Sequence, residues 1–273
     1  MIDILVDILK DTKEKNPLIH QITNYVTVND CANVTLAIGA SPVMADEIDE
    51  VEDFVDIASS LLLNIGTINK RVKKSIKKAS SKAKSINTPV ILDPVGVGAS
   101  KIRTSIVKEL LKESKVDVLR GNISEIKSIL KISSNTKGVD ASKDDFDSIE
   151  NLSFIAKKLS KKYKNIVAIT GEVDIISDGK RAVAIKNGND LLPKITGTGC
   201  MCSSLIASFC GTSNDKLFEA TVLGILVMGI AGEIASINAN KKNLGTFHKG
   251  LFNVIGNFNE EILRSMAKIK VLS

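Results

Sequence analysis

Short runs of β-branched and aliphatic residues alternate with helical patterns through the first two thirds of this chain. We expect strands at residues 18–23, 42–44, 61–64, 90–94, 116–119, 166–170, 175–177 and 182–185. Helical patterns lie between them, near residues 28–38, 50–59, 68–86, 101–113, 122–131 and 148–163. Strands that alternate with helices of this length predict an α/β fold, with a mostly parallel central sheet and helices on both faces.

The rest of the chain modifies this plan. The two runs on either side of 177–180 (SDGK) are close enough to form a small antiparallel hairpin. From residue 198 onward we expect helices only, near 199–211, 215–238 and 246–266. The uncharged apolar run 220–232 is too short to span a bilayer, so it predicts a buried helix. Residues 133–147 predict a surface excursion with a short helix, and residues 1–273 are expected to form a single domain.

Charge and cysteine content argue against several classes of function. The net charge of +6 comes mostly from residues 70–84, which predict an amphipathic helix with a lysine-rich solvent face. No aromatic residues interrupt these lysines, so we expect no nucleic-acid partner. The four cysteines do not show the spacing of a zinc site. The chain begins without a basic leader, and we expect a cytoplasmic protein with no membrane partner.

Polar residues and glycines follow most of the expected strands. In an open α/β sheet, ligands bind outside the carboxyl ends of the strands. The segments at these positions are 24–25 (NY), 64–67 (NIGT), 93–100 (DPVGVGAS), 120–125 (RGNISE) and 170–172 (TGE). Their recurrence at one edge predicts a binding crevice there.

The segment 194–204 (KITGTGCMCSS) is the most informative motif. A small-residue helix is expected to begin at Thr198 or Gly199. Its free backbone N–H groups and its dipole would form an anion site, suited to a phosphate or to a phosphoryl group in transfer. Cys200 lies in the first turn, where the same field would lower the pKa of the thiol. A Gly-x-Gly turn can also simply close a loop, so the motif does not decide the function alone.

Phosphoryl transfer needs positioning and charge neutralisation, and the strand ends offer candidates for both tasks. Asp93 and Glu125 could hold Mg²⁺ through water, and Arg120 could bind nucleotide phosphates. Each has a structural alternative. Asp93 could cap the turn before Pro94, Glu125 could complete a capping box with Asn122, and Arg120 could be a surface ion-pair residue. The chain contains neither a P-loop motif nor an early dinucleotide-binding motif.

Taken together, the motifs resemble those of the hydroxyethylthiazole kinase family. The matching blocks occur in order and cover most of the chain. They are 17–26 (PLIHQITNYV), 39–45 (GASPVMA), 92–100 (LDPVGVGAS), 120–126 (RGNISEI), 170–174 (TGEVD) and 196–200 (TGTGC), with 245–247 (GTF) fitting the last helix.

The resemblance implies a ribokinase-like fold and a homotrimer with active sites between subunits. It implies ATP-dependent phosphorylation of 4-methyl-5-(2-hydroxyethyl)thiazole, in thiamine biosynthesis or salvage. By motif match, Asn24, Met44 and Gly197 would contact the thiazole. Arg120, Asn122 and Thr170 would bind ATP, and Asp93 and Glu125 would organise Mg²⁺. Gly197, Gly199 and Cys200 would surround the γ-phosphoryl group.

The position of Cys200 departs from the wider ribokinase-like pattern, in which an aspartate base follows the Gly-x-Gly turn. A thiolate could accept the proton of the alcohol, although a lower pKa would make it a weaker base. Cys200 could also be a small packed residue. We expect Cys31, Cys202, Cys210 and His20 to be core residues, and we assign no role to His248.

Two further functions stay open on the sequence. One is a kinase of the same fold for another small alcohol, such as a hydroxymethylpyrimidine, pyridoxal or a sugar. The other is a relative that binds a thiazole or a nucleotide without catalysis. Asp93, Arg120 and Glu125 argue against the second, because a thiazole binder needs neither magnesium nor a triphosphate clamp.

Overall fold

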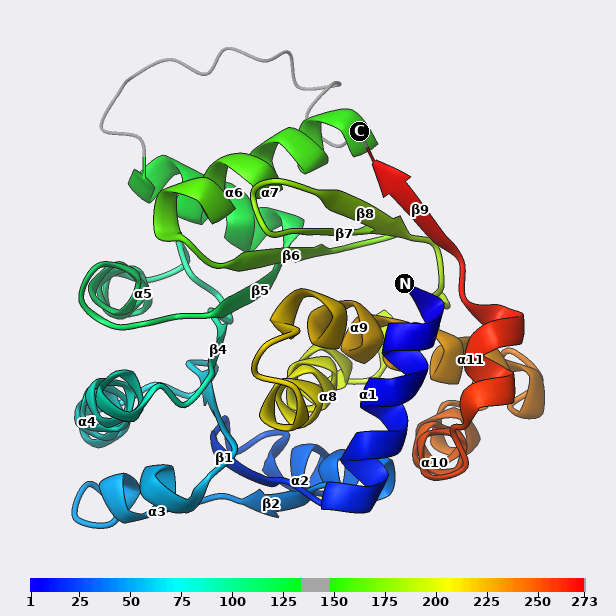
Figure 1. The fold of residues 1–273 in the computed structure, drawn as a ribbon, viewed down its shortest axis with the longest axis horizontal. Coiled ribbons are helices and arrows are strands. Elements are labelled where there is room, and N and C mark those ends of the chain that lie inside the picture. Colours follow the sequence, from blue (N-terminus) through cyan, green and yellow to red (C-terminus); the bar gives the residue numbers. More distant parts are fainter. Residues whose placement is uncertain (134–147, 273) are drawn as a thin grey trace.

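One twisted sheet forms the centre of the protein in a computed structural model, which describes residues 1–133 and 148–272. Within the described residues the sheet has nine strands (Figure 1). In spatial order they are β2 (Ser41–Val43), β1 (Leu18–Ile22), β3 (Ser60–Asn64), β4 (Val90–Asp93), β5 (Val118–Asn122), β6 (Ile166–Thr170), β7 (Asp174–Ser177), β8 (Ala182–Ile185) and β9 (Ile269–Leu272). The strands from β2 to β6 are parallel, and β7, β8 and β9 add to the sheet in antiparallel order.

Helices cover both faces of this sheet, as Figure 1 shows. One face packs against α1 (Ile2–Lys15), α2 (Val28–Ile38), α8 (Thr198–Thr212), α9 (Leu217–Asn238), α10 (Leu244–Gly256) and α11 (Glu260–Met266). The other face packs against α3 (Val51–Ile57), α4 (Lys70–Ile86), α5 (Lys101–Glu113), α6 (Ile123–Ser133) and α7 (Ile149–Tyr163).

Strand β3 illustrates how the two cores form. Leu62 lies in the core beside α8, whereas Leu61 and Leu63 lie in the core on the opposite face. Successive side chains of a strand point to opposite faces, so a strand buried on both sides needs a continuous aliphatic run. The predicted α/β fold with its parallel sheet, two helical layers and antiparallel hairpin is confirmed.

The predicted helix 220–232 is part of α9. This helix is long and apolar enough to cross a membrane, with a mean hydropathy of 2.0 over its most apolar window, but 83% of that window is buried inside the fold. Helix α9 is therefore the central core helix of its layer. The lysine-rich face of α4 is also confirmed, and several of its lysines pair with carboxylates, such as Lys73 and Lys77 with Glu109.

Three predictions about the elements are wrong. The chain after residue 198 is not all helical, because 269–272 pairs with β8 as β9. The single helix expected at 246–266 is two helices, and the side chain of Asn259 caps the second by accepting the N–H of Ile262 at 2.9 Å. Strand β5 continues to Asn122, so Arg120 lies within the strand, not after it.

Helix α1 was not among the expected elements. Of the excursion expected at 133–147, residues 134–147 lie outside the described residues.

Candidate active site

Polar side chains lie at or near the carboxyl ends of four neighbouring strands, on the sheet face that α8 and α9 cover. In each strand an aliphatic residue packs in the core that includes α8 and α9, and the polar residue follows two positions later. The pairs are Leu62 and Asn64, Ile91 and Asp93, Val118 and Arg120, and Ala168 and Thr170. Side chains two positions apart on a strand point the same way. These polar side chains therefore lie on one face of the sheet, near its carboxyl edge, where ligands of such folds bind.

The first turn of α8 leaves backbone N–H groups free at this edge. Gly197 is the N-cap residue, and its φ of 91° is a left-handed conformation that favours glycine. A Cβ there would lie 2.4 Å from Thr27 Cγ2. The N–H of Met201 donates to Gly197 O at 2.8 Å, so the N–H groups of residues 198–200 precede the first intrahelical bond. Together with the helix dipole they give this turn the geometry that the sequence predicts for an anion site.

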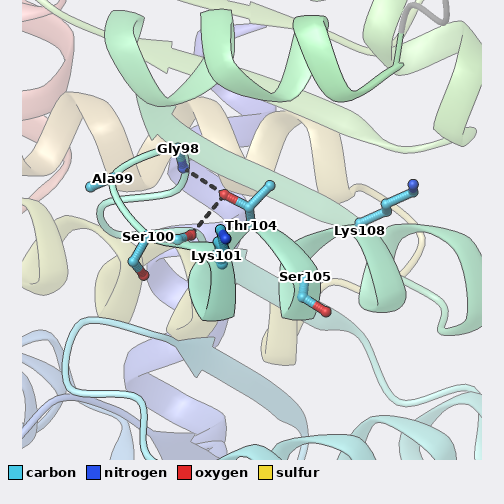
Figure 2. A pocket seen from close by; sticks show the side chains of 7 residues that line it. All are labelled: Gly98, Ala99, Ser100, Lys101, Thr104, Ser105 and Lys108. Carbon is cyan, nitrogen blue, oxygen red and sulfur yellow. Dashed lines mark hydrogen bonds between the residues drawn. The ribbon is translucent and has the colours of Figure 1, made fainter.

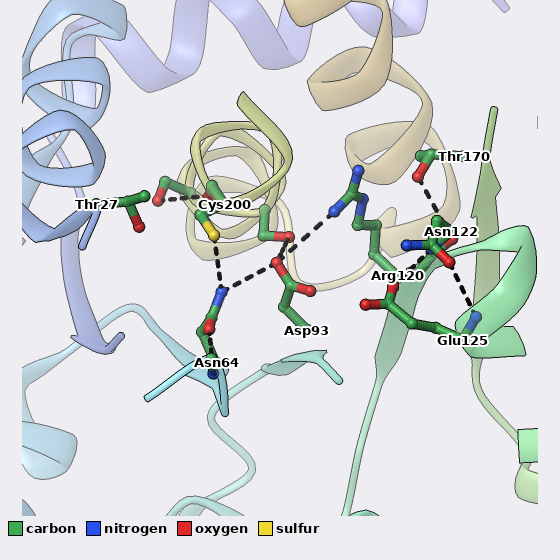
Figure 3. A network of polar contacts seen from close by, with 12 residues as sticks. Thr27, Asn64, Asp93, Arg120, Asn122, Glu125, Thr170 and Cys200 are labelled. Carbon is green, nitrogen blue, oxygen red and sulfur yellow. Dashed lines mark hydrogen bonds and ion pairs between the residues drawn. The ribbon is translucent and has the colours of Figure 1, made fainter. Parts of the chain in front are cut away.

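Two carboxamides donate to the thiol of Cys200. Asn24 Nδ2 lies 3.1 Å from Cys200 Sγ. Asn64 Nδ2 lies 3.2 Å from the same sulfur (Figure 3). The oxygen of each carboxamide is held as well, because Asn24 Oδ1 accepts the N–H of Thr27 at 3.2 Å and Asn64 Oδ1 accepts the N–H of Gly66 at 2.8 Å. Both amide N–H groups are therefore aimed at the sulfur.

Asp93 is fully buried between Asn64, Ser203 and Arg120. Its Oδ2 accepts the amide of Asn64 from Nδ2 at 3.1 Å and lies 3.7 Å from Arg120 Nη1 (Figure 3). The same oxygen accepts the hydroxyl of Ser203 at 2.8 Å. Its Oδ1 has no hydrogen-bond partner among the described residues. Burial raises the pKa of Asp93 to about 6, although the charge of Arg120 opposes this shift.

The guanidinium of Arg120 packs on the first turn of α8. A Cβ on Gly199 would lie 2.8 Å from Arg120 Nη1, so the glycine permits this approach. The arginine side chain is only 12% exposed and interacts electrostatically with Asp93 and Asp174. It is not the surface ion-pair residue that the sequence also allowed. Burial raises the pKa of Asp174 to about 7, against the N–H of Gly171 and the charge of Arg120.

Glu125 and Asn122 form the capping box that the sequence left open. Glu125 Oε2 accepts the N–H of Asn122 at 2.8 Å, and Asn122 Oδ1 accepts the N–H of Glu125 at 2.9 Å (Figure 3). The second oxygen of Glu125 accepts the N–H of Gly96 at 2.9 Å. Glu125 thus fixes both the start of α6 and the loop that follows Asp93.

The remaining predicted residues, Thr170 and Met44, make no hydrogen bond to Cys200 or Asp93 in the part of the chain that the structure describes. Thr170 lies at the end of β6 and donates to Gly121 O at 3.4 Å. Met44 directly follows the edge strand β2 and is half-buried. It is not part of the hydrogen-bonded group around Cys200 in the described residues.

A cavity of about 530 Å³ opens beside the loop after β4, at the start of α5. There Thr104 Oγ1 accepts the N–H of Gly98 at 3.2 Å and donates to Ser100 O at 2.9 Å (Figure 2). None of the predicted site residues lines this cavity, which is bounded by Gly98, Ala99, Ser100, Lys101, Thr104, Ser105 and Lys108.

The expectation of a lowered thiol pKa at Cys200 is wrong. The thiol is only 8% exposed, and burial and then the charge of Asp93 raise its pKa above the ordinary value. The amides of Asn24 and Asn64 favour the thiolate but do not outweigh this desolvation. The position in the first turn of the helix suggested a lowered thiol pKa, whereas burial and the charge of Asp93 raise it.

Sequence reasoning missed Asn64 and Ser203 as members of the site. Asn64 bridges Asp93 and Cys200, and Ser203 lies one helical turn after Cys200 and donates to Asp93. Asn64 could have been predicted because it is a polar residue at the end of a strand. Ser203 could have been predicted because it lies three positions after Cys200, on the same face of the helix.

The expectations for the other cysteines and for His20 are confirmed. Cys31, Cys202 and Cys210 are buried. His20 is buried against Phe54, with Nε2 2.7 Å from Ala45 O. His248 pairs with Asp30 at 3.2 Å.

Comparison with known proteins identifies one family. A sequence model of the hydroxyethylthiazole kinase family matches residues 9–261. A curated hydroxyethylthiazole kinase of Clostridium tetani is 54% identical over 260 residues, which cover 94% of this chain and 94% of that protein.

Solved structures agree with this result. The structure of the hydroxyethylthiazole kinase protein from Pyrococcus horikoshii OT3 is similar with a TM-score of 0.90 and 35% identity, covering 99% of this chain and 100% of that one. The Staphylococcus aureus pyridoxal kinase in complex with ADP has a TM-score of 0.62 at 14% identity, over 93% of this chain and 98% of that one. This second likeness concerns the fold alone.

Proposed function

The chain belongs to the hydroxyethylthiazole kinase family, and from this premise we propose that it transfers the γ-phosphoryl group of ATP to the hydroxyl of 4-methyl-5-(2-hydroxyethyl)thiazole, in thiamine salvage. One observation carries the proposal. The free N–H groups of α8, the thiol of Cys200, the carboxylate of Asp93 and the guanidinium of Arg120 meet at one edge of the sheet. This is the arrangement of positive and polar groups that phosphoryl transfer requires.

We assign the triphosphate to the strand ends around Arg120. Its guanidinium lies against Gly199, so a phosphoryl group bound at the N–H groups of residues 198–200 would lie within its reach. Arg120 and these N–H groups would neutralise charge on the phosphates as the group transfers. Thr170 and Asn122 end the two neighbouring strands β6 and β5 and would contact the nucleotide.

The residues present fit a magnesium ion. Asp93 Oδ1 is a buried oxygen without a hydrogen-bond partner in the described residues, which suits a cation or a water bound to it. Glu125 already accepts two backbone N–H groups, so it would contribute through its remaining lone pairs and through water. Magnesium supplies charge neutralisation on the phosphates when it is bound. We propose Asp93 and Glu125 as the residues that hold it.

We propose that Cys200 receives the proton of the alcohol. Its sulfur accepts two amide N–H groups and follows directly after Gly199 in the anion-binding turn. A thiolate there is stabilised by Asn24 and Asn64, and proton removal is needed only late in a loose transition state. In this proposal the sulfur of Cys200 receives the proton that the hydroxyl loses as the phosphoryl group is transferred.

The alcohol would bind beside Asn24, Gly197 and Met44. Tyr25 and Val26, which follow Asn24, are 53% and 67% exposed. We propose the homotrimer with active sites between subunits that the family resemblance implies, in which a neighbouring subunit would cover these two side chains. We also propose that residues 1–273 act as one kinase domain and that the enzyme works in the cytoplasm, in keeping with four free cysteines.

A coupled assay of ADP release tests the function. With ATP and magnesium, the purified protein should release ADP when the thiazole alcohol is added and release little without it. Hydroxymethylpyrimidine, pyridoxal and a sugar, supplied at the same concentration, should give at least tenfold lower kcat/KM. A higher kcat/KM for one of these would assign the enzyme to that alcohol, and ADP release independent of any alcohol would refute the kinase assignment.

A further inference from the structure

Two tight turns lie at the centre of the site, directly after Asn64 and Asp93. The turn after β3 is closed by the N–H of Ile68 donating to Ile65 O at 3.2 Å. The turn after β4 is closed by the N–H of Val97 donating to Pro94 O at 2.9 Å. These turns position the bridging carboxamide and the buried carboxylate, so their separation sets the geometry of the reacting groups.

A single arginine connects the two turns. Arg103, in the first turn of α5, donates from Nη2 to Gly66 O at 2.6 Å and from Nη1 to Val95 O at 2.5 Å. Both bonds are short, as expected for a charged donor. A guanidinium holds its two Nη groups in a fixed planar fork, so two such bonds define both the distance and the orientation of their acceptors.

The surroundings of Arg103 are adapted to this contact. A positive charge in the first turn of a helix is disfavoured by the helix dipole, and the two carbonyl oxygens compensate for it. Gly96 has a φ of 70°, and a Cβ there would lie 2.6 Å from Arg103 Nη1. A side chain at position 96 would therefore displace the guanidinium.

The contacts of Arg103 lead directly to the reacting groups. The N–H of Gly66 donates to Asn64 Oδ1 and thereby turns the Nδ2 of Asn64 toward Cys200 and Asp93. We propose that Arg103 is a positioning residue, which holds the β3 and β4 turns at the separation that phosphoryl transfer requires. The proposal rests on the proposed function, because it concerns the same site. Arg103 itself touches neither the thiol nor the carboxylate by any hydrogen bond in the described residues.

Arg103→Met and Arg103→Lys test this role. Methionine keeps the length of the side chain but loses both bonds, whereas lysine keeps the charge and can reach one carbonyl at a time. We expect kcat to fall about tenfold to a hundredfold in the methionine variant and less in the lysine variant. The KM values for ATP and for the thiazole alcohol should each change less than threefold. Arg264→Met is the matched control, because Arg264 also makes two contacts through its guanidinium, here with the carboxylates of Asp3 and Glu260, but lies on α11.

Amide hydrogen exchange gives a second readout that does not depend on turnover. In Arg103→Met, the N–H groups of Ile68 and Val97 should exchange faster, while those of the central strands keep the wild-type rate. If Arg103→Met retains wild-type kcat, or if both turns exchange at the wild-type rate, the positioning role is wrong. If the methionine variant does not fold, the lysine variant decides by the same two measures. Failure of the proposed function is distinct, because the wild-type protein itself would then not phosphorylate the alcohol.

Discussion

Replacing Cys200 tests whether the thiol acts as the base. The thiol is buried, and burial together with the charge of Asp93 raises its pKa above its ordinary value of 9.0. A thiol whose pKa is raised above its ordinary value stays mostly protonated at pH 7. If the thiolate receives the proton, the wild-type kcat should increase with pH, approaching about tenfold per unit between pH 6 and 8.5.

Two variants at this position should behave differently. In Cys200→Asp the carboxyl group has a much lower ordinary pKa than a thiol, so a larger fraction of it is ionised at pH 7 even after burial raises its pKa. A carboxylate is a weaker base, but the late proton transfer of a loose transition state makes base strength less important. Cys200→Asp should therefore keep or raise kcat at pH 7 and lose most of the pH dependence. Cys200→Ala should lower kcat, by about tenfold to a hundredfold, near the lower end of the usual range for a general base.

The assay is ADP release at saturating ATP, magnesium and thiazole alcohol from pH 6 to 9, at constant ionic strength. The alanine variant leaves the amides of Asn24 and Asn64 without the sulfur acceptor, which costs about 1–3 kcal/mol for each buried group that stays unpaired. Its thermal unfolding must therefore be measured beside its activity. A folded Cys200→Ala enzyme with wild-type kcat, or with the same rise of kcat with pH, would refute the base role.

Three further substitutions probe the same site. Arg120→Ala should lower kcat/KM for ATP by about a hundredfold or more, because charged hydrogen bonds contribute about 1.5–3 kcal/mol each. The affinity for the thiazole alcohol, measured by calorimetry, should change less than threefold. Turnover within a few fold of wild type would contradict the assignment of Arg120 to ATP. Gly197→Ala should lower both melting temperature and kcat, because the residue has a φ of 91° and the added Cβ would lie 2.4 Å from Thr27 Cγ2; wild-type values of both would show that the turn adapts. Asp174 has a folded-state pKa of about 7, above its unfolded value. Its contribution to the free energy of unfolding is therefore complete below about pH 4 and is lost as pH rises through 7. The loss amounts to about 4 kcal/mol at most. In urea unfolding at fixed protein concentration, the stability of Asp174→Asn relative to wild type should therefore increase from pH 5 to pH 8, and an equal pH dependence of the two proteins would contradict the buried, proton-binding carboxyl.

Much of the site could be predicted because its polar side chains occur at equivalent positions, near the carboxyl ends of successive strands. Asp93 and Thr170 each end a strand predicted from local aliphatic runs, and parallel strands bring their carboxyl ends to one edge. The start of α8 at Thr198 could also be predicted, because a glycine pair before a run of small residues indicates the beginning of a helix. The resemblance to the kinase family then supplied the roles that spacing alone left open.

The two bonds of Arg103 could not be predicted from the sequence. Its position in the first turn of a helix gives no reason to expect acceptors at Gly66 and Val95, which belong to two other loops. The same is true of Asn64, whose two donors reach a carboxylate and a thiol that lie far apart in the chain. Contacts of this kind depend on how the strands align, and no local pattern contains that alignment.

By itself, the sequence determined the alternation of strands and helices, the glycines that begin α8 and the polar residues at the strand ends. These properties follow from residue type and short-range periodicity. Only the tertiary structure decided that β9 joins β8, that the thiol of Cys200 has a raised pKa and that Arg103 connects two turns. Strand pairing, desolvation and long-range hydrogen bonds depend on groups distant in sequence, so they exist only once the whole chain has packed.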